Sequence, residues 1–484
     1  MTEKNKEIKV ENKKEKAKDI ATKVQQHNGS GNALSYSDTL DRFLAHPVIG
    51  LIFFALIMWL MFTISQMWVG PFIAGYLEML MSLIGNGVES LLISLNVNDV
   101  LIAFILEGII GGFSAVIGFL PLIMVLFFML YLLEDSGYMA RVALLMDKYF
   151  KKIGLAGKSI IPMYVGTACA IPAIMSARTI KNERQRRMTI LLTPFIPCGA
   201  KLPVIALFLG VFFTGKAYMT AGIYLIAILI IYVTGITIKH LLNVDLDEIE
   251  DTFIIVEMPE YKRPSFIQAF LSMIDRAKAF IIKAGTIILL ANALVWFFVN
   301  FDFTLSMVDA NDSILAFLAR PIAFLLTPIG VASWGLAAAA VLGFVAKEEV
   351  VGALAVIFAF SVSDDFEIES IAATRDALMV GAGLTSVSAL AYMAFNLFTP
   401  PCFAAIGAMN TEFESKKWTV LAIFLQLSIG FLSALIIYQV GSLIVTGSFG
   451  KGALAGFIVL AVYVLGYIYF VNQAKKGKGL AKID

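Results

Sequence analysis

Long runs of apolar residues, separated by short polar segments, make up most of the chain after position 47. Several runs extend over about 20 residues, the length that an α-helix needs to span the hydrocarbon core of a bilayer. Backbone groups in lipid must find partners within the spanning segment, so such runs predict helices. We therefore expect an all-α polytopic membrane protein with about ten transmembrane helices. The expected spans are 48–68, 100–133, 188–213, 217–238, 280–300, 314–327, 335–360, 377–399, 418–443 and 452–471.

The composition agrees with this pattern. Of the 484 residues, 59% are hydrophobic and 15% are charged, whereas soluble domains carry about 25% charged residues. The net charge of +1 gives no indication of a nucleic-acid partner. The three cysteines lie within apolar stretches, so they predict no disulfide framework. The partner that the composition predicts is the lipid bilayer.

Charges between the apolar runs predict an orientation. The segment 1–47, the loop 178–187, the segment 262–278 and the C-terminal tail are rich in Lys and Arg, and such loops stay in the cytoplasm. The loops 302–312 and 364–369 are acidic, which places them outside. We expect a multi-pass protein of the cell (inner or plasma) membrane with both termini in the cytoplasm.

All three cysteines, Cys169, Cys198 and Cys402, lie close to proline. Proline lacks a backbone donor and interrupts a helix, so each cysteine lies where main-chain carbonyls are freed at membrane depth. Thiolates and unpaired carbonyls can replace the hydration shell of a metal ion. The alternative is that each cysteine packs as a small apolar side chain.

A short motif around two of these cysteines occurs twice, as Thr193-Pro-Phe-Ile-Pro-Cys198 and as Thr399-Pro-Pro-Cys402. In the expected topology the first lies on a span that runs outward and the second on one that runs inward. This is the pattern of inverted repeats, whose broken helices meet at a substrate site near the bilayer midplane. The alternative is chance similarity of two proline-rich strings. The expected divisions are a cytoplasmic polar arm at 1–47, a first transmembrane helix with an interfacial segment at 48–99, a first repeat at 100–239, a cytoplasmic loop at 240–279, a second repeat at 280–410, and C-terminal helices with a basic tail at 411–484.

Charged side chains inside an apolar run are the next candidates. Lys347, Glu348 and Glu349 follow one another between two strongly apolar segments, and charges at membrane depth are costly enough to mark functional sites. Pairing of Lys347 with one glutamate would make the group structural. An unpaired Glu348 or Glu349 would instead bind a cation or accept a proton. Carboxylate oxygen beside cysteine sulfur suits a divalent transition metal better than Mg²⁺ or Ca²⁺.

Three further features carry less weight. Met163 precedes Cys169 and would supply a thioether ligand, although most methionines of an apolar chain are packing residues. Glu107 is expected near the external interface, where a glutamate is unremarkable. The string Gly154 to Ser159 resembles the end of a P-loop, but Lys152 stands where a Walker A motif needs its first glycine. We therefore expect no nucleotide site and no enzymatic activity.

Several ordered motifs together resemble the membrane domain of ferrous iron transport protein B (FeoB), over roughly 37–441 of the sequence. The motifs that carry the resemblance are Leu40-Asp-Arg-Phe43, Leu133-Glu-Asp-Ser-Gly-Tyr-Met-Ala-Arg141, Met146-Asp147, Ile153-Gly-Leu-Ala-Gly-Lys-Ser159, Pro172-Ala-Ile-Met175, Arg178-Thr-Ile-Lys-Asn-Glu-Arg184, Cys198-Gly-Ala-Lys-Leu-Pro203, Ala346-Lys-Glu348 and Pro401-Cys402. The resemblance implies two gate-type repeats that form a cation path for Fe²⁺ as substrate. It further implies that the three cysteines line this path and that Glu348 lies at the second gate.

The sequence departs from the family's pattern in two ways. No segment here matches the family's regulatory G domain, so we expect a separate small GTPase, a small cytoplasmic regulator, or neither. The family's Gly-Cys-Asn-Val-Pro is here Ala168-Cys-Ala-Ile-Pro172, which removes an amide next to Cys169. The second departure leaves another soft divalent metal open as the substrate.

Three hypotheses follow. The first is a metal-ion permease that takes up Fe²⁺ as its favoured substrate and needs no bound cofactor. The second is a gate-family transporter of a nucleoside or other small organic solute, whose site would need converging amide, hydroxyl and aromatic groups. The third is a membrane scaffold for a separate GTPase. The sequence leaves open which metal is carried, the energy source and whether the protein forms a homo-oligomer.

Overall fold

The protein is described here from a computed structural model, which covers residues 46, 49–152, 154–155, 157–213, 218–242, 261–304, 306–358 and 373–473. The predictions made for the polar arm before His46, for residues 243–260 of the expected loop 240–279, for the acidic loop 364–369 and for the basic tail after residue 473 fall outside these residues. The described residues form helices and no strand, apart from one isolated bridge between Phe301 and Met307. The prediction of an all-α polytopic membrane protein is confirmed.

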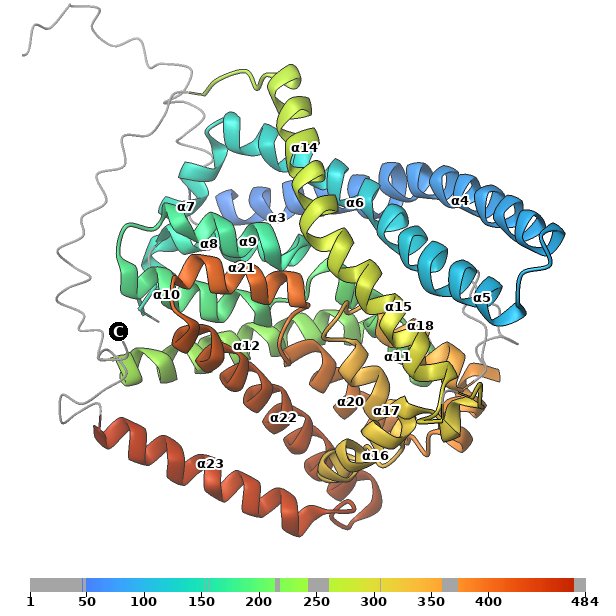
Figure 1. Cartoon of the computed structure of the whole chain (residues 1–484). Coiled ribbons are helices and arrows are strands. Elements are labelled where there is room, and N and C mark those ends of the chain that lie inside the picture. The colour runs from blue at the N-terminus through green and yellow to red at the C-terminus, as the bar shows by residue number, and fades with distance from the viewer. Residues whose placement is uncertain are drawn as a thin grey trace, which may run out of the picture. The chain divides into compact units, whose positions relative to one another are not determined.

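The first half of the described chain consists of helices joined by short connections (Figure 1). They are α3 (Ile49–Phe62), η1 (Thr63–Trp68), α4 (Val69–Ser94), α5 (Asp99–Ala103), η2 (Phe104–Ile110), α6 (Gly111–Asp135), α7 (Tyr138–Lys152), η3 (Gly157–Ser159), α8 (Ile160–Ala168), α9 (Ala170–Ser176), η4 (Ala177–Thr179), α10 (Glu183–Leu192), η5 (Thr193–Phe195), η6 (Gly199–Lys201), α11 (Leu202–Phe212) and α12 (Tyr218–Leu242). Segments η1 and η2 are π-helical turns, which widen a helix locally and are frequent at functional sites.

The second half of the described chain is also helical. Its helices are α14 (Phe266–Phe280), η7 (Ile281–Gly285), α15 (Thr286–Asn300), η8 (Ala310–Asp312), α16 (Ile314–Leu326), η9 (Thr327–Ile329), α17 (Trp334–Leu342), α18 (Glu349–Ile357), η10 (Ala377–Gly381), α20 (Ser386–Phe398), α21 (Phe403–Phe413), α22 (Lys416–Thr446) and α23 (Ala453–Gln473). Side-chain caps fix several starts. Asn182 accepts a hydrogen bond from the backbone of Gln185 at the start of α10, and Thr385 and Ser388 form a capping box at the start of α20.

Six helices among the described residues are long and apolar enough to cross a membrane, or seven if the bent pair α16–α17 counts as one span. The two members of that pair meet at 98°. This count covers the described residues and is lower than the predicted ten. The expected span 335–360 divides into two short helices, α17 and α18, and the last expected span is counted only as a shorter apolar helix over Ala453–Tyr463. The segment after the first span is helical and continuous with it over Ile52–Ser94, and its expected position at the membrane interface stays a prediction.

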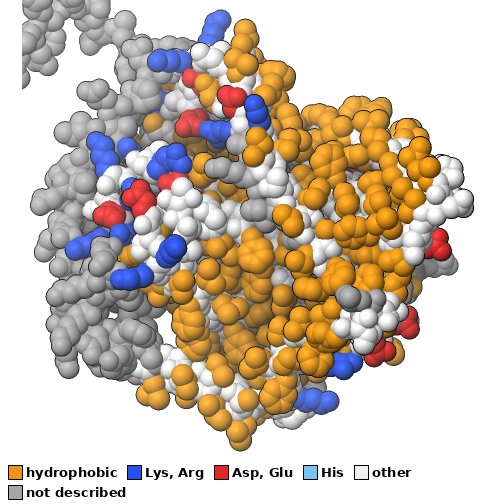
Figure 2. Space-filling model, viewed as in Figure 1, with side chains coloured by type: hydrophobic (Ala, Val, Ile, Leu, Met, Phe, Trp, Pro, Cys, Tyr) orange, Lys and Arg blue, Asp and Glu red, His pale blue; other side chains and the backbone are white. Residues whose placement is uncertain are grey.

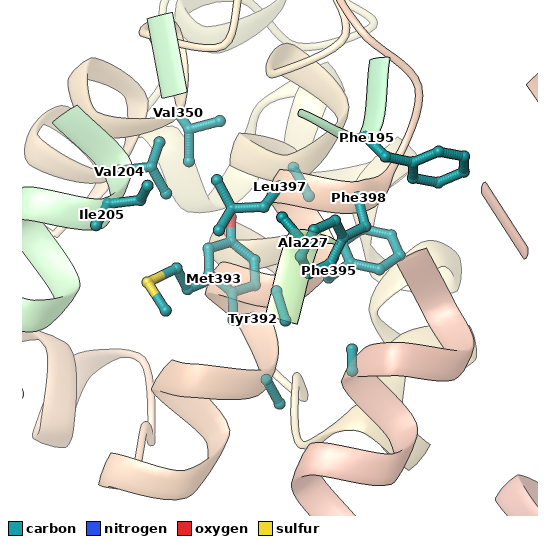
Figure 3. Close-up of a cluster of buried hydrophobic side chains, with 14 of the residues drawn as sticks. Phe195, Val204, Ile205, Ala227, Val350, Tyr392, Met393, Phe395, Leu397 and Phe398 are labelled. Carbon is teal, nitrogen blue, oxygen red and sulfur yellow. The ribbon is translucent and has the colours of Figure 1, made fainter. Parts of the chain in front are cut away.

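The core joins the two halves of the chain. Figure 3 shows apolar side chains of η5 and α11 packed in one buried cluster with those of α18 and α20. The ring of Phe208 on α11 meets the ring of Tyr392 on α20 edge-on, with centroids 5.5 Å apart. The fully buried Tyr392 also donates its hydroxyl hydrogen to the carbonyl oxygen of Leu336 on α17, at 2.9 Å. These contacts hold the broken helices in place around the site.

The outer surface carries many large apolar side chains, on α4, α12, α14 and α22 among others. Figure 2 shows this apolar surface as a broad area, with Lys and Arg gathered toward one side of the view. Exposed apolar patches of this extent mark surfaces that face lipid or another protein. The helix lengths and the apolar surface both indicate a multi-pass membrane protein.

Candidate metal-ion path

Four interruptions in the helices meet around one cavity of about 60 Å³, which has room for a few water-sized groups. Each interruption carries one of the predicted residues: Cys169, Cys198, Glu348 or Cys402. The lining residues are Ile123, Ala168, Cys169, Ala170, Ile171, Pro194, Ile196, Cys198, Ala200, Lys201, Val345, Ala346, Lys347, Glu348, Pro401, Cys402 and Ala404. The structure thus brings together three thiols and one carboxylate that lie far apart in the sequence.

Cys169 is the joint between α8 and α9. Its backbone is extended, with φ −152° and ψ 132°, between two short helices. Pro172 has no N–H group, so the carbonyl of Ala168 lacks the donor that a continuous helix would give it. Gly199 lies against this carbonyl, because a Cβ atom at position 199 would be only 3.3 Å from the Ala168 oxygen. The interruption therefore leaves a backbone oxygen beside the cavity.

Cys198 ends the second interruption. After η5 the chain is extended at Ile196 and again at Cys198, where φ is −89° and ψ is 170°, before η6 begins. Pro194 and Pro197 remove two backbone donors from this stretch. Thr193 donates its hydroxyl hydrogen to the carbonyl oxygen of Thr189 at 2.7 Å, which supports the last turn of α10. This bond gives the threonine a structural role.

Cys402 follows Pro400 and Pro401 and precedes the first residue of α21. In a continuous helix these two positions would donate to the carbonyls of Asn396 and Leu397, and proline cannot. Side chains replace the missing donors. The hydroxyl of Thr399 donates to the Asn396 oxygen at 3.4 Å. The ammonium group of Lys201 donates to the Leu397 oxygen.

Glu348 lies in the fourth interruption, between the end of α17 at Leu342 and the start of α18 at Glu349. Phe344 accepts a hydrogen bond from the backbone N–H of Phe403 at 2.8 Å, which ties this interruption to the start of α21. Glu348 is a lining residue, whereas Glu349 is absent from the cavity wall. Glu349 instead accepts a long hydrogen bond, at 3.5 Å, from the side-chain amide of Asn292.

Two buried lysines share the cavity wall. Lys201 and Lys347 are each only 2% exposed. Lys347 donates to the hydroxyl of Thr399 at 3.3 Å and lies over the ring of Phe344. The alternative in which Lys347 pairs with a neighbouring glutamate is not found among the ion pairs of the described residues. Lys201 was not a candidate in the sequence, although a lysine within an apolar run is the signal that would have marked it.

The remaining candidates lie apart from the cavity. Met163 is 5% exposed and belongs to the large apolar core, not to the lining. Glu107 accepts a hydrogen bond from the indole N–H of Trp296 at 2.7 Å. Trp296 and Asn292 are four positions apart on α15, so the partners of Glu107 and Glu349 lie on one face of that helix.

The cavity is not a ready-made metal site. Among the described residues, no three His, Cys, Asp or Glu side chains lie close enough to hold an ion together. Its donors are nevertheless a soft set, with sulfur on three sides and one carboxylate. A path needs ligands that bind a passing ion weakly enough to release it. Dispersed thiols meet that requirement better than a closed cluster does.

The sequence is similar to known membrane proteins. The family model of Gate, described as "Nucleoside recognition", matches residues 116–212 and 281–416. The Fe(2+) transporter FeoB of Staphylococcus aureus (strain COL) is 36% identical over 416 residues, which are 85% of this chain and 60% of that protein. FeoB of Campylobacter jejuni is 34% identical over 79% of this chain and 61% of its own length. FeoB of Methanocaldococcus jannaschii is 31% identical over 85% of this chain and 60% of its own length.

The chain thus spans about 60% of the length of these curated relatives. No solved structure matches the chain. The two stretches that the Gate model matches contain all four interruptions around the cavity.

Proposed function

This chain has the membrane domain of the FeoB family, and we propose that it transports a divalent transition-metal ion across the membrane, with ferrous iron as the leading substrate. The relatives that carry the name Fe(2+) transporter support the choice of iron. The observation that carries the proposal is the convergence of Cys169, Cys198, Cys402 and Glu348 on one cavity.

The chemistry of this cavity fits a borderline cation. Sulfur ligands favour Fe²⁺, Zn²⁺ and related ions over Mg²⁺ and Ca²⁺, which prefer oxygen. The carboxylate of Glu348 supplies negative charge for an ion that has lost part of its hydration shell. Backbone carbonyls such as that of Ala168, which lacks its helical donor, add neutral oxygen ligands. These groups together replace water around an ion as it passes the interruptions.

Transport of a nucleoside is the competing proposal, because the description of the Gate model names nucleosides. A nucleoside site needs amide and hydroxyl groups for the base and the sugar, and aromatic rings for stacking. The lining contains no Asn, Gln, Ser, Thr or aromatic side chain. Its polar side chains are two lysines, one glutamate and three thiols, which favours the ion.

The environment of Cys169 bears on which metal is carried. Ala168 and Ala170 both line the cavity, so the position where the family has asparagine faces the site here without an amide. The donor set is therefore softer than the family pattern implies. We propose Fe²⁺ as a substrate with weaker discrimination against Zn²⁺ or Cd²⁺ than an amide-bearing site would have.

Uptake into proteoliposomes tests the proposal. Purified protein is reconstituted, and the entry of Fe²⁺ under reducing conditions, Mn²⁺, Zn²⁺ and a radiolabelled nucleoside is compared with protein-free vesicles. We expect saturable entry of a transition metal and no entry of the nucleoside. Nucleoside entry without metal entry would reverse the assignment. Regulation by a separate GTPase, a homo-oligomeric state and the cytoplasmic position of the termini stay predictions.

A further inference from the structure

The side chain of Lys201 connects the interruption at Cys198, in the first Gate stretch, with the end of α20 just before the interruption at Cys402, in the second. Lys347 makes a comparable side-chain bond within the second Gate stretch, to Thr399. The ammonium group of Lys201 donates to the carbonyl oxygen of Pro194, at 2.9 Å, in the first Gate stretch. It also donates to the carbonyl oxygen of Leu397 in the second Gate stretch. Only 2% of Lys201 is exposed, and its ammonium group is bound by these two protein oxygens.

Both acceptors are available because the helices are interrupted. Pro401 cannot donate to Leu397, and the extended backbone at Cys198 cannot donate to Pro194. A buried carbonyl without a donor is unfavourable, so each needs a partner. A buried ammonium group without acceptors is unfavourable as well. Lys201 and the two carbonyls therefore satisfy one another.

We propose that Lys201 is a latch between the two repeats, whose ammonium group occupies the carbonyl oxygen of the cavity-lining Pro194 and that of Leu397 in place of the transported cation. The proposal rests on the proposed function for the identity of that cation, but the latch itself does not require it. When Lys201 donates to both carbonyls, the interruptions at Cys198 and Cys402 are held together and the cavity is closed. An ion can pass only after Lys201 has left at least one of its two carbonyls.

Charge gives a second reason for this release. The ammonium groups of Lys201 and Lys347 line the same small cavity, with the carboxylate of Glu348 as the only acidic side chain of the lining. An entering divalent cation is repelled by both ammonium groups across a medium of low dielectric constant. Movement of Lys201 away from the Leu397 carbonyl lowers this repulsion and frees an oxygen for the ion. Ion entry and opening of the latch are therefore coupled.

Accessibility of Cys402 tests the latch without a transport assay. Cys169 and Cys198 are replaced by serine, so that Cys402 is the only thiol, and its rate of reaction with a small maleimide is measured in proteoliposomes. Lys201→Met removes both bonds at similar side-chain volume. Because it removes charged hydrogen bonds that favour the closed state, we expect Cys402 to react about tenfold faster or more.

Lys347→Met is the matched control. Lys347 is equally buried and lines the same cavity, but its hydrogen-bond partner Thr399 lies in the same Gate stretch as Lys347 itself. We expect its effect on the reaction rate to stay within about twofold. An equal acceleration by both variants would overturn the latch, because the cause would then be loss of charge or of stability. A Lys201→Met rate within about twofold of the parent would overturn it as well.

A second variant keeps the lysine and serves if Lys201→Met does not fold. Pro401→Ala returns a backbone donor to the Leu397 carbonyl, which then competes with Lys201. We expect faster reaction of Cys402 here too, and an unchanged rate would contradict the latch. If the variants accelerate the reaction of Cys402 but the wild-type protein carries no metal, the latch stands and the proposed metal substrate is refuted. If the wild-type protein carries metal but the variants leave the reaction rate of Cys402 unchanged, the latch is refuted and the proposed function stands.

Discussion

Cys198 and Cys402 line the same cavity, and each directly follows a proline and directly precedes the residue at which helical structure resumes. One belongs to the first Gate stretch and the other to the second. The sequence motif that the two share therefore corresponds to one local structure, used twice. A proline sets both cysteines at a helix interruption, and the packing of α11 against α18 and α20 brings the two interruptions together.

The two adjacent glutamates are expected to differ in their effect on transport. Glu348 lines the cavity, whereas Glu349 lies off its wall and accepts from Asn292. Glu348→Gln removes the one carboxylate from the ion's surroundings, and we expect metal uptake to fall by about 10- to 100-fold. Glu349→Gln should reduce uptake by less than about tenfold. Equal losses, measured as initial rates per folded protein, would place both carboxylates on the path.

Met163 is expected to contribute to packing and not to transport, because it lies in the apolar core away from the cavity lining. Met163→Leu conserves volume and should cost less than about 1.5 kcal/mol of stability. Met163→Ala leaves a void and should cost about 2–5 kcal/mol. Uptake by the Met163→Leu variant should match wild type. A loss of uptake at unchanged stability would mean that the thioether binds the ion.

The hydroxyl of Tyr392 is expected to stabilise the second Gate stretch, since it donates to the Leu336 carbonyl from a fully buried position. Tyr392→Phe should lower the free energy of unfolding by about 0.5–1.5 kcal/mol. Tyr131→Phe is the control, because that hydroxyl makes a longer bond, at 3.3 Å, to Gln268 at the surface. Thermal unfolding in detergent measures both, and a larger shift for Tyr131→Phe would contradict the expectation.

Restoring an amide beside Cys169 is expected to change metal preference. Ala170→Asn places an oxygen donor in the cavity wall, and oxygen is a harder ligand than sulfur. We expect the ratio of Fe²⁺ to Cd²⁺ uptake to rise severalfold. Ala170→Val fills similar space without a donor and should leave the ratio unchanged. If valine changes the ratio as much as asparagine does, the effect is one of volume and the amide has no part in selection.

The sequence predicted the elements of the site better than their number or their full membership. Proline beside Cys169, Cys198 and Cys402 was sufficient to predict interrupted helices, because proline acts locally through its missing N–H group. The repeated motif predicted that Cys198 and Cys402 meet, whereas the place of Cys169 on the same path was implied only by the family resemblance. The number of spans was harder to predict, since hydropathy alone cannot say whether an apolar run such as 335–360 is one helix or two.

Lys201 and Met163 show where sequence reasoning ends. The hydrogen-bond partners of Lys201 are backbone carbonyls, one of them 196 positions away. Because every residue has a carbonyl, the sequence does not indicate which ones bind the lysine. Met163 seemed a ligand because it lies near Cys169 in the chain. The direction in which the Met163 side chain points depends on its position around the axis of α8, and at this position the side chain packs in the apolar core. Packing between repeats thus decides which candidates meet.

Metal uptake by cysteine variants tests the central claim most directly. Fe²⁺ uptake into proteoliposomes is measured for wild type, for each Cys→Ser variant and for the variant with Cys169, Cys198 and Cys402 all replaced by serine. Melting temperatures confirm that each protein is folded. If the three thiols line the ion path, the triple variant carries no more Fe²⁺ than protein-free vesicles, while each single variant is impaired. Undiminished uptake by the folded triple variant would contradict the thiol path.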